Sequence, residues 1–252
     1  MNVKESPLAP LVTARFVKRS LVVLFLAASL TLIINQFTEL DLKLADLYYD
    51  PGLKDFPWRN TWFATTVMHD WAKYLIISFG LLLFITTLSD AIYPIRKISP
   101  LARAQLRVVT LTMILAPLTV AILKHASNIH CPWSIDRYGG NQLLLKLLDW
   151  TPPGWSAGQC FPAGHASTGM WLVALAAFWL PHHPRRALLA FLGGGSVGLA
   201  LGWVQQMRGA HFLTHTLATA WISSAILFAL IILIARFPPL ANGSLKKRKA
   251  CA

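Results

Sequence analysis

Six long apolar runs alternate with short polar or aromatic segments along the chain. The runs cover residues 20–36, 71–95, 108–123, 166–180, 187–204 and 213–235. An α-helix needs roughly 20 residues to cross the hydrocarbon core of a bilayer, and runs of this length are too long for the strands of a sheet. The pattern therefore predicts an all-α, polytopic membrane protein, with six transmembrane helices in one membrane domain that covers residues 1–252.

Several segments outside or within these runs need interpretation. The first run follows a basic segment, residues 1–19, and we interpret it as an uncleaved anchor because it is long and lacks a small-x-small cleavage site. Residues 37–70 are rich in aromatic residues, so they either lie along the outer membrane interface or form a simple loop. The leucine-rich residues 141–150 either dip into the outer leaflet or cover the site as a buried cap. Five glycines in the run 187–204 predict close helix packing there.

Composition and charge agree with a membrane protein. Hydrophobic residues make up 55% of the chain and charged residues 13%, about half the charged fraction of a soluble domain. The formal net charge is +13, but no basic stripe or nucleic-acid motif is present, so nucleic acid is not an expected partner. With the N-terminus inside, the cytoplasmic segments, including a basic tail at 237–252, hold 15 of the 23 Lys and Arg. The positive-inside rule therefore predicts that both termini are cytoplasmic.

Three polar islands lie at ends of the apolar runs, and all three fall on the outer side in this orientation. They cover residues 124–137, 160–168 and 208–215. Because the second island runs through a small turn into an apolar helix, whose N-terminus favours an anion, we expect three helix ends to converge on one phosphate site. Alone, Lys124 could be a snorkelling lysine and His165 a buried histidine. His211 and His215 could bind zinc as a pair, although no third ligand has convincing spacing.

The three islands resemble the motifs of the type 2 phosphatidic-acid phosphatase family, whose members include bacterial membrane lipid phosphatases and, more distantly, vanadium haloperoxidases. The family motifs read KxxxxxxRP, PSGH and SRxxxxxHxxxD. In this chain, Lys124 begins the first motif, Pro162-Ala163-Gly164-His165 forms the second, and His211 matches the histidine of the third. The motifs cover about residues 120–220, and the six predicted spans are similar to the family topology.

Three positions differ from the family pattern. Cys131 stands at the arginine of the first motif, Gln205 at the arginine of the third, and His215 at the aspartate of the third. Two phosphate-binding cations and one carboxylate that would orient the nucleophile are therefore missing. Asp136 or Asp149 is a candidate for the carboxylate, and the sequence does not choose between them.

The resemblance implies a mechanism that needs no metal and no cofactor. His211 attacks phosphorus as a neutral imidazole and forms a phosphohistidine, while His165 protonates the leaving oxygen and then activates water. His215 accepts a hydrogen bond from His211 in place of the missing carboxylate. The groups expected to hold the phosphate are Lys124, Arg137, Arg208 and the backbone N–H groups around Gly164.

The resemblance also implies a substrate and a location. We expect a lipid phosphatase of the bacterial inner (plasma) membrane whose active site faces the outer leaflet, acting on lipid A, undecaprenyl diphosphate, phosphatidylglycerophosphate or phosphatidic acid. A phosphotransferase, in which another lipid head group replaces water as acceptor, is a close alternative. The rival from another class is a non-catalytic lipid-phosphate binder or a transporter, but transporters place polar residues near mid-membrane, whereas here they cluster at span ends.

Two of the three cysteines lie beside the first two motifs. Because an oxidising outer compartment permits disulfides, we expect a bridge between Cys131 and Cys160 that ties the first island to the turn before His165. It would close a loop of about 30 residues and contribute on the order of 3–4 kcal/mol in the chain-entropy model. The alternative is two free buried thiols, and the third cysteine, Cys251, lies in the inner tail.

Overall fold

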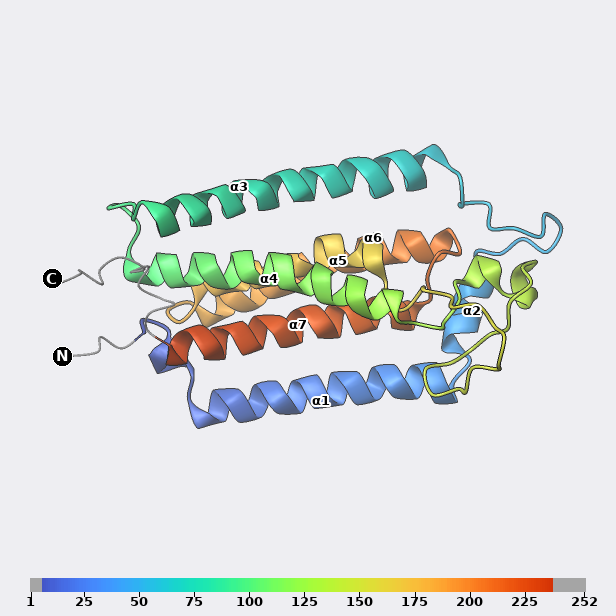
Figure 1. The fold of residues 1–252 in the computed structure, drawn as a ribbon, viewed down its shortest axis with the longest axis horizontal. Coiled ribbons are helices and arrows are strands. Elements are labelled where there is room, and N and C mark those ends of the chain that lie inside the picture. The colour runs from blue at the N-terminus through green and yellow to red at the C-terminus, as the bar shows by residue number, and fades with distance from the viewer. Residues whose placement is uncertain (1–5, 238–252) are drawn as a thin grey trace, which may run out of the picture.

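The computed structural model describes residues 6–237 and is all-helical over this part of the chain, without a β-strand. Five helices are long and apolar enough to cross a membrane, and they lie side by side in a bundle (Figure 1). They are α1 (Ala14–Phe37), the helix Phe63–Ile92, α4 (Pro100–His125), α6 (Pro184–Met207) and α7 (Leu213–Arg236). The prediction of an all-α, multi-pass membrane protein is confirmed.

The second long helix begins earlier than predicted. Its first part, η2 (Phe63–Trp71), is a π-helix, and it continues without a break as α3 (Ala72–Ile92). A short 3₁₀ turn, η1 (Ala9–Leu11), precedes α1. Of the predicted basic tail, all but Phe237 lies outside the described residues, and so does Cys251.

The fourth apolar run forms a shorter, narrower helix within the bundle. It begins as α5 (Gly164–Met170) and continues as a 3₁₀ helix, η5 (Trp171–Trp179), that is mostly buried and packs against α4 and α6. Glycines allow this close approach: a Cβ on Gly194 would lie 2.4 Å from the backbone of Leu172, and one on Gly198 would lie 2.8 Å from the Cα of Met170. These two glycines therefore pack helices closely, as predicted, whereas an added Cβ on Gly193 would meet no atom within 4 Å.

Helix α4 begins at Pro100, whereas the predicted run 108–123 begins later because the charged residues in the first turns of the helix indicated a loop. Ser99 caps the helix by accepting a hydrogen bond from the N–H of Ala102 at 3.1 Å, and Pro100 occupies the first turn. Arg103, which we expected in a cytoplasmic loop, lies inside the helix and forms a two-point ion pair with Asp90 of α3 (Nη2 to Oδ1, 2.9 Å). A charged residue can therefore lie within a helix of this bundle where a partner on the neighbouring helix neutralises it.

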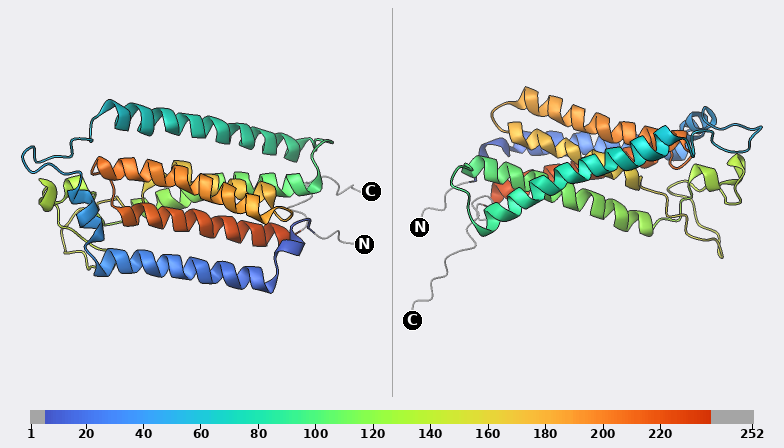
Figure 2. Two further views of the ribbon diagram at one scale, coloured as in Figure 1. Left: turned by 180° about the vertical axis from the view of Figure 1, so that it is seen from behind. Right: turned by 90° about the horizontal axis from the view of Figure 1, so that it is seen from above.

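The segments that carry the three polar islands gather at one end of the bundle, as the views in Figures 1 and 2 agree. A second, smaller core forms there around α2 (Leu40–Asp46) and two 3₁₀ turns, η3 (Pro132–Ser134) and η4 (Asp136–Tyr138). Its buried members are Leu42, Ala45, Phe56, Ile135, Tyr138 and Phe212. Residues 37–70 are thus more than a simple loop, because α2 buries one face against this core.

Residues 141–150 form no helix. They pack against the end of α1, where the N–H of Leu147 donates to the side chain of Asn35 (2.8 Å) and the N–H of Leu148 donates to the side chain of Gln36 (3.1 Å). Leu144 packs against the smaller core. No residue of 141–150 is fully buried, and Leu148 and Trp150 are exposed, so the segment is not a buried cap.

Candidate active site

The three polar islands are joined to one another through their backbones. Each hydrogen bond links residues that are far apart in the sequence, so the site depends on how the loops dock and not on one local motif. The bonds run from Cys160 N to Ile129 O (3.0 Å), from Trp133 N to Gly209 O (2.9 Å) and from Ala163 N to His215 O (3.1 Å). The prediction that three helix ends converge is met by these contacts.

A disulfide adds a covalent link between the first two islands. The sulfur atoms of Cys131 and Cys160 are bonded, with Cα atoms 5.3 Å apart. The Cys160 sulfur lies 3.1 Å from the carbonyl oxygen of Ala210 and 3.5 Å from Nδ1 of His211. The disulfide thus packs against the turn of the third island, at the position where the family motif has an arginine.

A tight turn between α6 and α7 presents His211. Gly209 has a φ of +71° in this turn, and a Cβ there would lie 2.3 Å from the ring of Phe56, so only glycine fits without strain or clash. The turn leaves the His211 side chain almost fully buried, at 6% exposure. Burial lowers the pKa of His211 to about 3, with a smaller contribution from the charge of Lys124. His211 is therefore a neutral imidazole at pH 7, the form that can act as a nucleophile.

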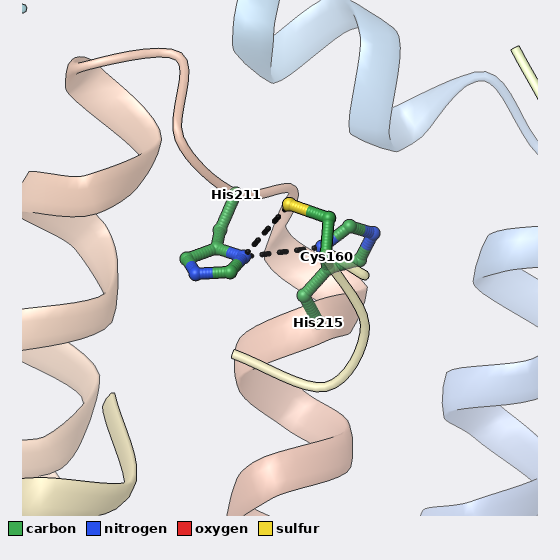
Figure 3. A group of neighbouring side chains, drawn as sticks. All are labelled: Cys160, His211 and His215. Atoms are coloured by element: carbon green, nitrogen blue, oxygen red, sulfur yellow. Dashed lines mark hydrogen bonds between the residues drawn. The ribbon is translucent and has the colours of Figure 1, made fainter. Parts of the chain in front are cut away.

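His215 contacts one ring nitrogen of His211. The Nδ1 atoms of His211 and His215 are 3.3 Å apart, and Figure 3 shows the other nitrogen of His211 pointing away from this contact. His215 lies one turn into α7 and is fully buried. The contact leaves Nε2 of His211 as the nitrogen available for chemistry.

A group of donor atoms at this place raises the question of a metal. Among the described residues, Cys160, His211 and His215 have ligand atoms within 4.8 Å of one another. The Cys160 sulfur is bonded to Cys131, however, and the sulfur that binds metals well is the free thiolate. Two imidazoles alone fall short of the three or four ligands of a zinc site, so the donor set does not fit zinc while the disulfide is intact.

His165 lies at the start of α5 in a more open and more charged environment. Its Nε2 is 3.2 Å from the carbonyl oxygen of Met68, and its ring stacks on that of His69 with centroids 4.4 Å apart. His69 in turn contacts Asp70 at 2.9 Å, and Lys73 lies 3.6 Å from the same carboxylate. We did not predict these three residues as part of the site, although a His-Asp pair and a lysine at the outer start of an apolar helix were the available signal.

Two cations lie beside this part of the site. The side chain of Lys124 packs against Gly164, where an added Cβ would lie 3.4 Å from the lysine Cδ. Arg208 donates to the carbonyl oxygen of Arg59 (3.0 Å) and to the side-chain oxygen of Gln205 (3.1 Å). Gln205 occupies the position of the family arginine, so in this chain it holds the guanidinium of Arg208 in place.

Arg137 is not brought to this cluster. Its guanidinium donates two hydrogen bonds to Asp46 of α2, at 3.1 and 2.7 Å, and Tyr138 donates a further one to the same carboxylate at 2.8 Å. These hydrogen bonds hold the pKa of Asp46 below its usual value. The structure therefore places Arg137 at α2, which it helps to dock through two of its five N–H donors, and its role as a phosphate ligand stays a prediction.

The two candidate carboxylates also lie elsewhere. Asp136 accepts a hydrogen bond from the N–H of Arg137 at 2.7 Å. Asp149 accepts from the N–H of Lys146 (2.9 Å) and from the side chain of Gln36 (3.0 Å). Both carboxylates thus stabilise loops, and neither replaces the aspartate missing from the third motif.

Sequence comparison places the chain in a family. No curated protein and no solved structure matches it. The family model described as the PAP2 superfamily, whose members are phosphatases, matches residues 105–238, more than half of the chain. This match begins in α4 and includes all three polar islands. The chain therefore belongs to the PAP2 superfamily.

Proposed function

We propose that this protein is an integral membrane lipid phosphatase that removes phosphate from a lipid monophosphate or diphosphate through a phosphohistidine intermediate on His211. The observation that carries the proposal is the buried, neutral imidazole of His211, whose Nδ1 faces His215 while Nε2 points away from that contact. A nucleophile of this kind needs its attacking nitrogen free and its other nitrogen held. Membership of a phosphatase superfamily supports the same chemistry.

The other residues take complementary roles in this proposal. His165 protonates the leaving oxygen and then removes a proton from the water that hydrolyses the phosphohistidine. Lys124, Arg208 and the N–H groups around Gly164 bind the phosphate oxygens, where negative charge must be stabilised. The charge of Lys73 also acts on His165, so Lys73 is a further cation of the site that we did not expect from the sequence.

We further propose that the helix Gly164–Trp179 is a sixth membrane span. Seven α-helical and nine 3₁₀ residues rise about 28 Å, because each 3₁₀ residue adds about 2.0 Å against 1.5 Å in an α-helix. This is close to the roughly 30 Å of a hydrocarbon core. With six spans, the basic residues at the starts of α4 and α6 and at the end of α7 face the cytoplasm, and the site faces the outer side of the inner membrane.

The substrate class follows from the position of the site at the end of a membrane bundle. A lipid carries its phosphate to that depth while its chains stay in the bilayer. The candidates are lipid A, undecaprenyl diphosphate, phosphatidylglycerophosphate and phosphatidic acid. We propose these four as the panel because their phosphates share one chemistry and differ in the head group.

The test is phosphate release by detergent-purified protein from this panel, with a chelator present throughout. We expect release by the wild type and by His182→Ala, an exposed histidine on the turn before α6, and none by His211→Ala. Release by His211→Ala at the wild-type rate would contradict the assignment of the nucleophile. Absence of release by the wild type, followed by phosphate transfer when an acceptor lipid is added, would indicate the phosphotransferase instead.

A further inference from the structure

The proposed chemistry fixes which nitrogen of each buried histidine carries a proton. This step rests on the proposed function. If Nε2 of His211 attacks phosphorus, it must be unprotonated, so the proton of the neutral ring is on Nδ1. That Nδ1–H then donates to Nδ1 of His215 at 3.3 Å. His215 consequently accepts at Nδ1 and carries its own proton on Nε2.

The Nε2–H of His215 has no hydrogen-bond partner among the described residues. The side chain is 0% exposed, so bulk water does not reach it. Buried donors in folded proteins nearly always have a partner, either a protein group or an ordered water. An acceptor for this proton should therefore lie in the immediate surroundings of His215.

A small cavity of about 20 Å³ lies beside His215. A cavity of this size holds one water molecule if polar groups surround it. Its polar lining consists of Asn35, Thr38, Asp41, Lys146 and His215. Lys146 directs its ammonium group to the carbonyl oxygens of Gln36 and Thr38, at 3.3 and 3.4 Å, and toward Glu39 at 3.6 Å. The carboxylate in this lining is that of Asp41.

The side chain of Asp41 is hydrogen-bonded to the start of α7. It belongs to α2 and is only 8% exposed. One oxygen accepts the N–H of Thr214 at 3.0 Å, and the other accepts the hydroxyl of the same threonine, which also accepts a hydrogen bond from Asn35 at 3.2 Å. Asp41 and His215 line the same small cavity, and the carboxylate is fixed there with lone pairs still available.

We propose that Asp41 is the carboxylate that this chain uses in place of the family aspartate, and that it acts on His211 through one water and His215. As Nε2 of His211 forms its bond to phosphorus, positive charge develops on the ring. The chain of hydrogen bonds from His211 through His215 and the water to Asp41 stabilises that charge, and no proton has to leave the chain. Asp41 is thus a positioning residue that comes from a different helix than the histidines.

The first test reads the hydrogen-bond chain without any turnover. Nitrogen NMR of histidine-labelled protein distinguishes which ring nitrogen carries the proton, and the signals of His215 are assigned by their loss in His215→Asp. We expect the proton of His215 on Nε2, with a changed shift and faster solvent exchange in Asp41→Asn. A proton on Nδ1 of His215, or an unchanged signal in Asp41→Asn, would overturn the proposal.

The second test is a double-mutant cycle in phosphate release. Asp41→Asn should lower kcat about 10- to 100-fold in the wild-type background. In the His215→Asp background, a carboxylate at position 215 accepts directly from His211, so Asp41→Asn should change kcat by no more than about 2-fold. Equal effects of Asp41→Asn in both backgrounds would mean that Asp41 only stabilises the fold, and would overturn the proposal.

A matched control separates this role from the docking of α2. Asp46→Asn makes the same change on the same helix, five residues along, and removes the contacts of Asp46 to Arg137 and Tyr138. We expect it to leave the His215 signals unchanged, since Asp46 does not line the cavity beside His215. If the wild type releases no phosphate from any lipid, the proposed function fails, and the NMR result still decides whether Asp41 is linked to His215.

Discussion

The two histidines that we propose as catalytic lie in contrasting surroundings. His211 is almost fully buried against a second histidine and a disulfide, and one cation, Lys124, acts on it electrostatically. His165 stacks on His69, contacts a backbone carbonyl and lies within electrostatic reach of Lys73 and Arg208. Burial keeps the His211 ring neutral, and the cations around His165 would attract an anionic substrate.

This contrast shows how one site can separate two tasks that conflict. A nucleophilic imidazole must stay unprotonated, which burial achieves, whereas phosphate binding requires accessible positive charge. The proposed nucleophile lies in the turn before α7, and the cations lie on α3, on α4 and directly after α6. Substitutions on the two sides should therefore have different kinetic signatures.

The largest effect on kcat should come from replacing each of the two histidines in turn with alanine. On lipid substrates, His211→Ala and His165→Ala should each lower kcat on the order of 10,000-fold or more, because each removes a group that reacts. With an activated leaving group such as nitrophenolate, no proton donor is needed for the first step. His165→Ala should then accumulate an acid-labile phosphoenzyme, and His211→Ala should form none.

Phosphorus NMR or labelled phosphate bound to the denatured protein distinguishes these cases. His182→Ala serves as the control for loss of a histidine far from the site, and it should behave as the wild type. A phosphoenzyme in His211→Ala would show that the two roles are reversed or that another residue is the nucleophile.

The next largest effect should separate the two arginines that the sequence suggested. Arg208→Ala should lower kcat/KM for lipid phosphate about 100- to 1,000-fold, the range found when one stabilising donor is removed from an active site. Arg137→Ala should change it no more than about 2-fold, because Arg137 binds Asp46 and not the site. Comparable losses in both variants, measured on the same lipid, would return Arg137 to the site.

The fold followed from the sequence to the extent that it depends on long apolar runs. The ends of two spans were less predictable. Arg103 lies inside α4 because Asp90 on the neighbouring helix neutralises its charge, and the second span begins with a π-helix that carries polar residues. The helix Gly164–Trp179 was recognised from its apolar character, although its 3₁₀ half makes it shorter in residues than an ordinary span. The hydrophobic pattern indicates where each helix lies along the chain, but it does not indicate which other helices that helix contacts.

The candidate site was predictable where it follows local motifs and unpredictable where it depends on docking. Lys124, His165 and His211 stand in ordered motifs, so their convergence could be expected. Asp41 and His69 belong to no motif, and they reach the site only because α2 and η2 pack at the same end of the bundle. The partners of a buried histidine are set by tertiary structure, which spacing along the chain does not encode.

Removing the disulfide should affect stability more than chemistry. The bridge closes a loop of about 30 residues between the first two islands, so replacing both Cys131 and Cys160 with Ala should lower the thermal midpoint on the order of 5–10 °C. The wild type should show one free thiol when denatured without reductant, since three cysteines are present and two are bonded. A count of three thiols, or a midpoint unchanged in the double variant, would contradict a stabilising bridge.

The smallest effect should be a pH dependence of stability that comes from burying His211. Its pKa is about 3 in the folded protein, against 6.5 for an ordinary histidine. Between these values the unfolded chain binds a proton at this position and the folded protein does not, so stability falls as the pH is lowered through this range, by at most about 1.4 kcal/mol per pH unit. Thermal midpoints from about pH 7 down to about pH 4.5 should therefore fall more steeply for the wild type than for His211→Gln. His182→Gln controls for the loss of an exposed histidine, and a slope for His211→Gln equal to that of the wild type would show that His211 takes up its proton without unfolding.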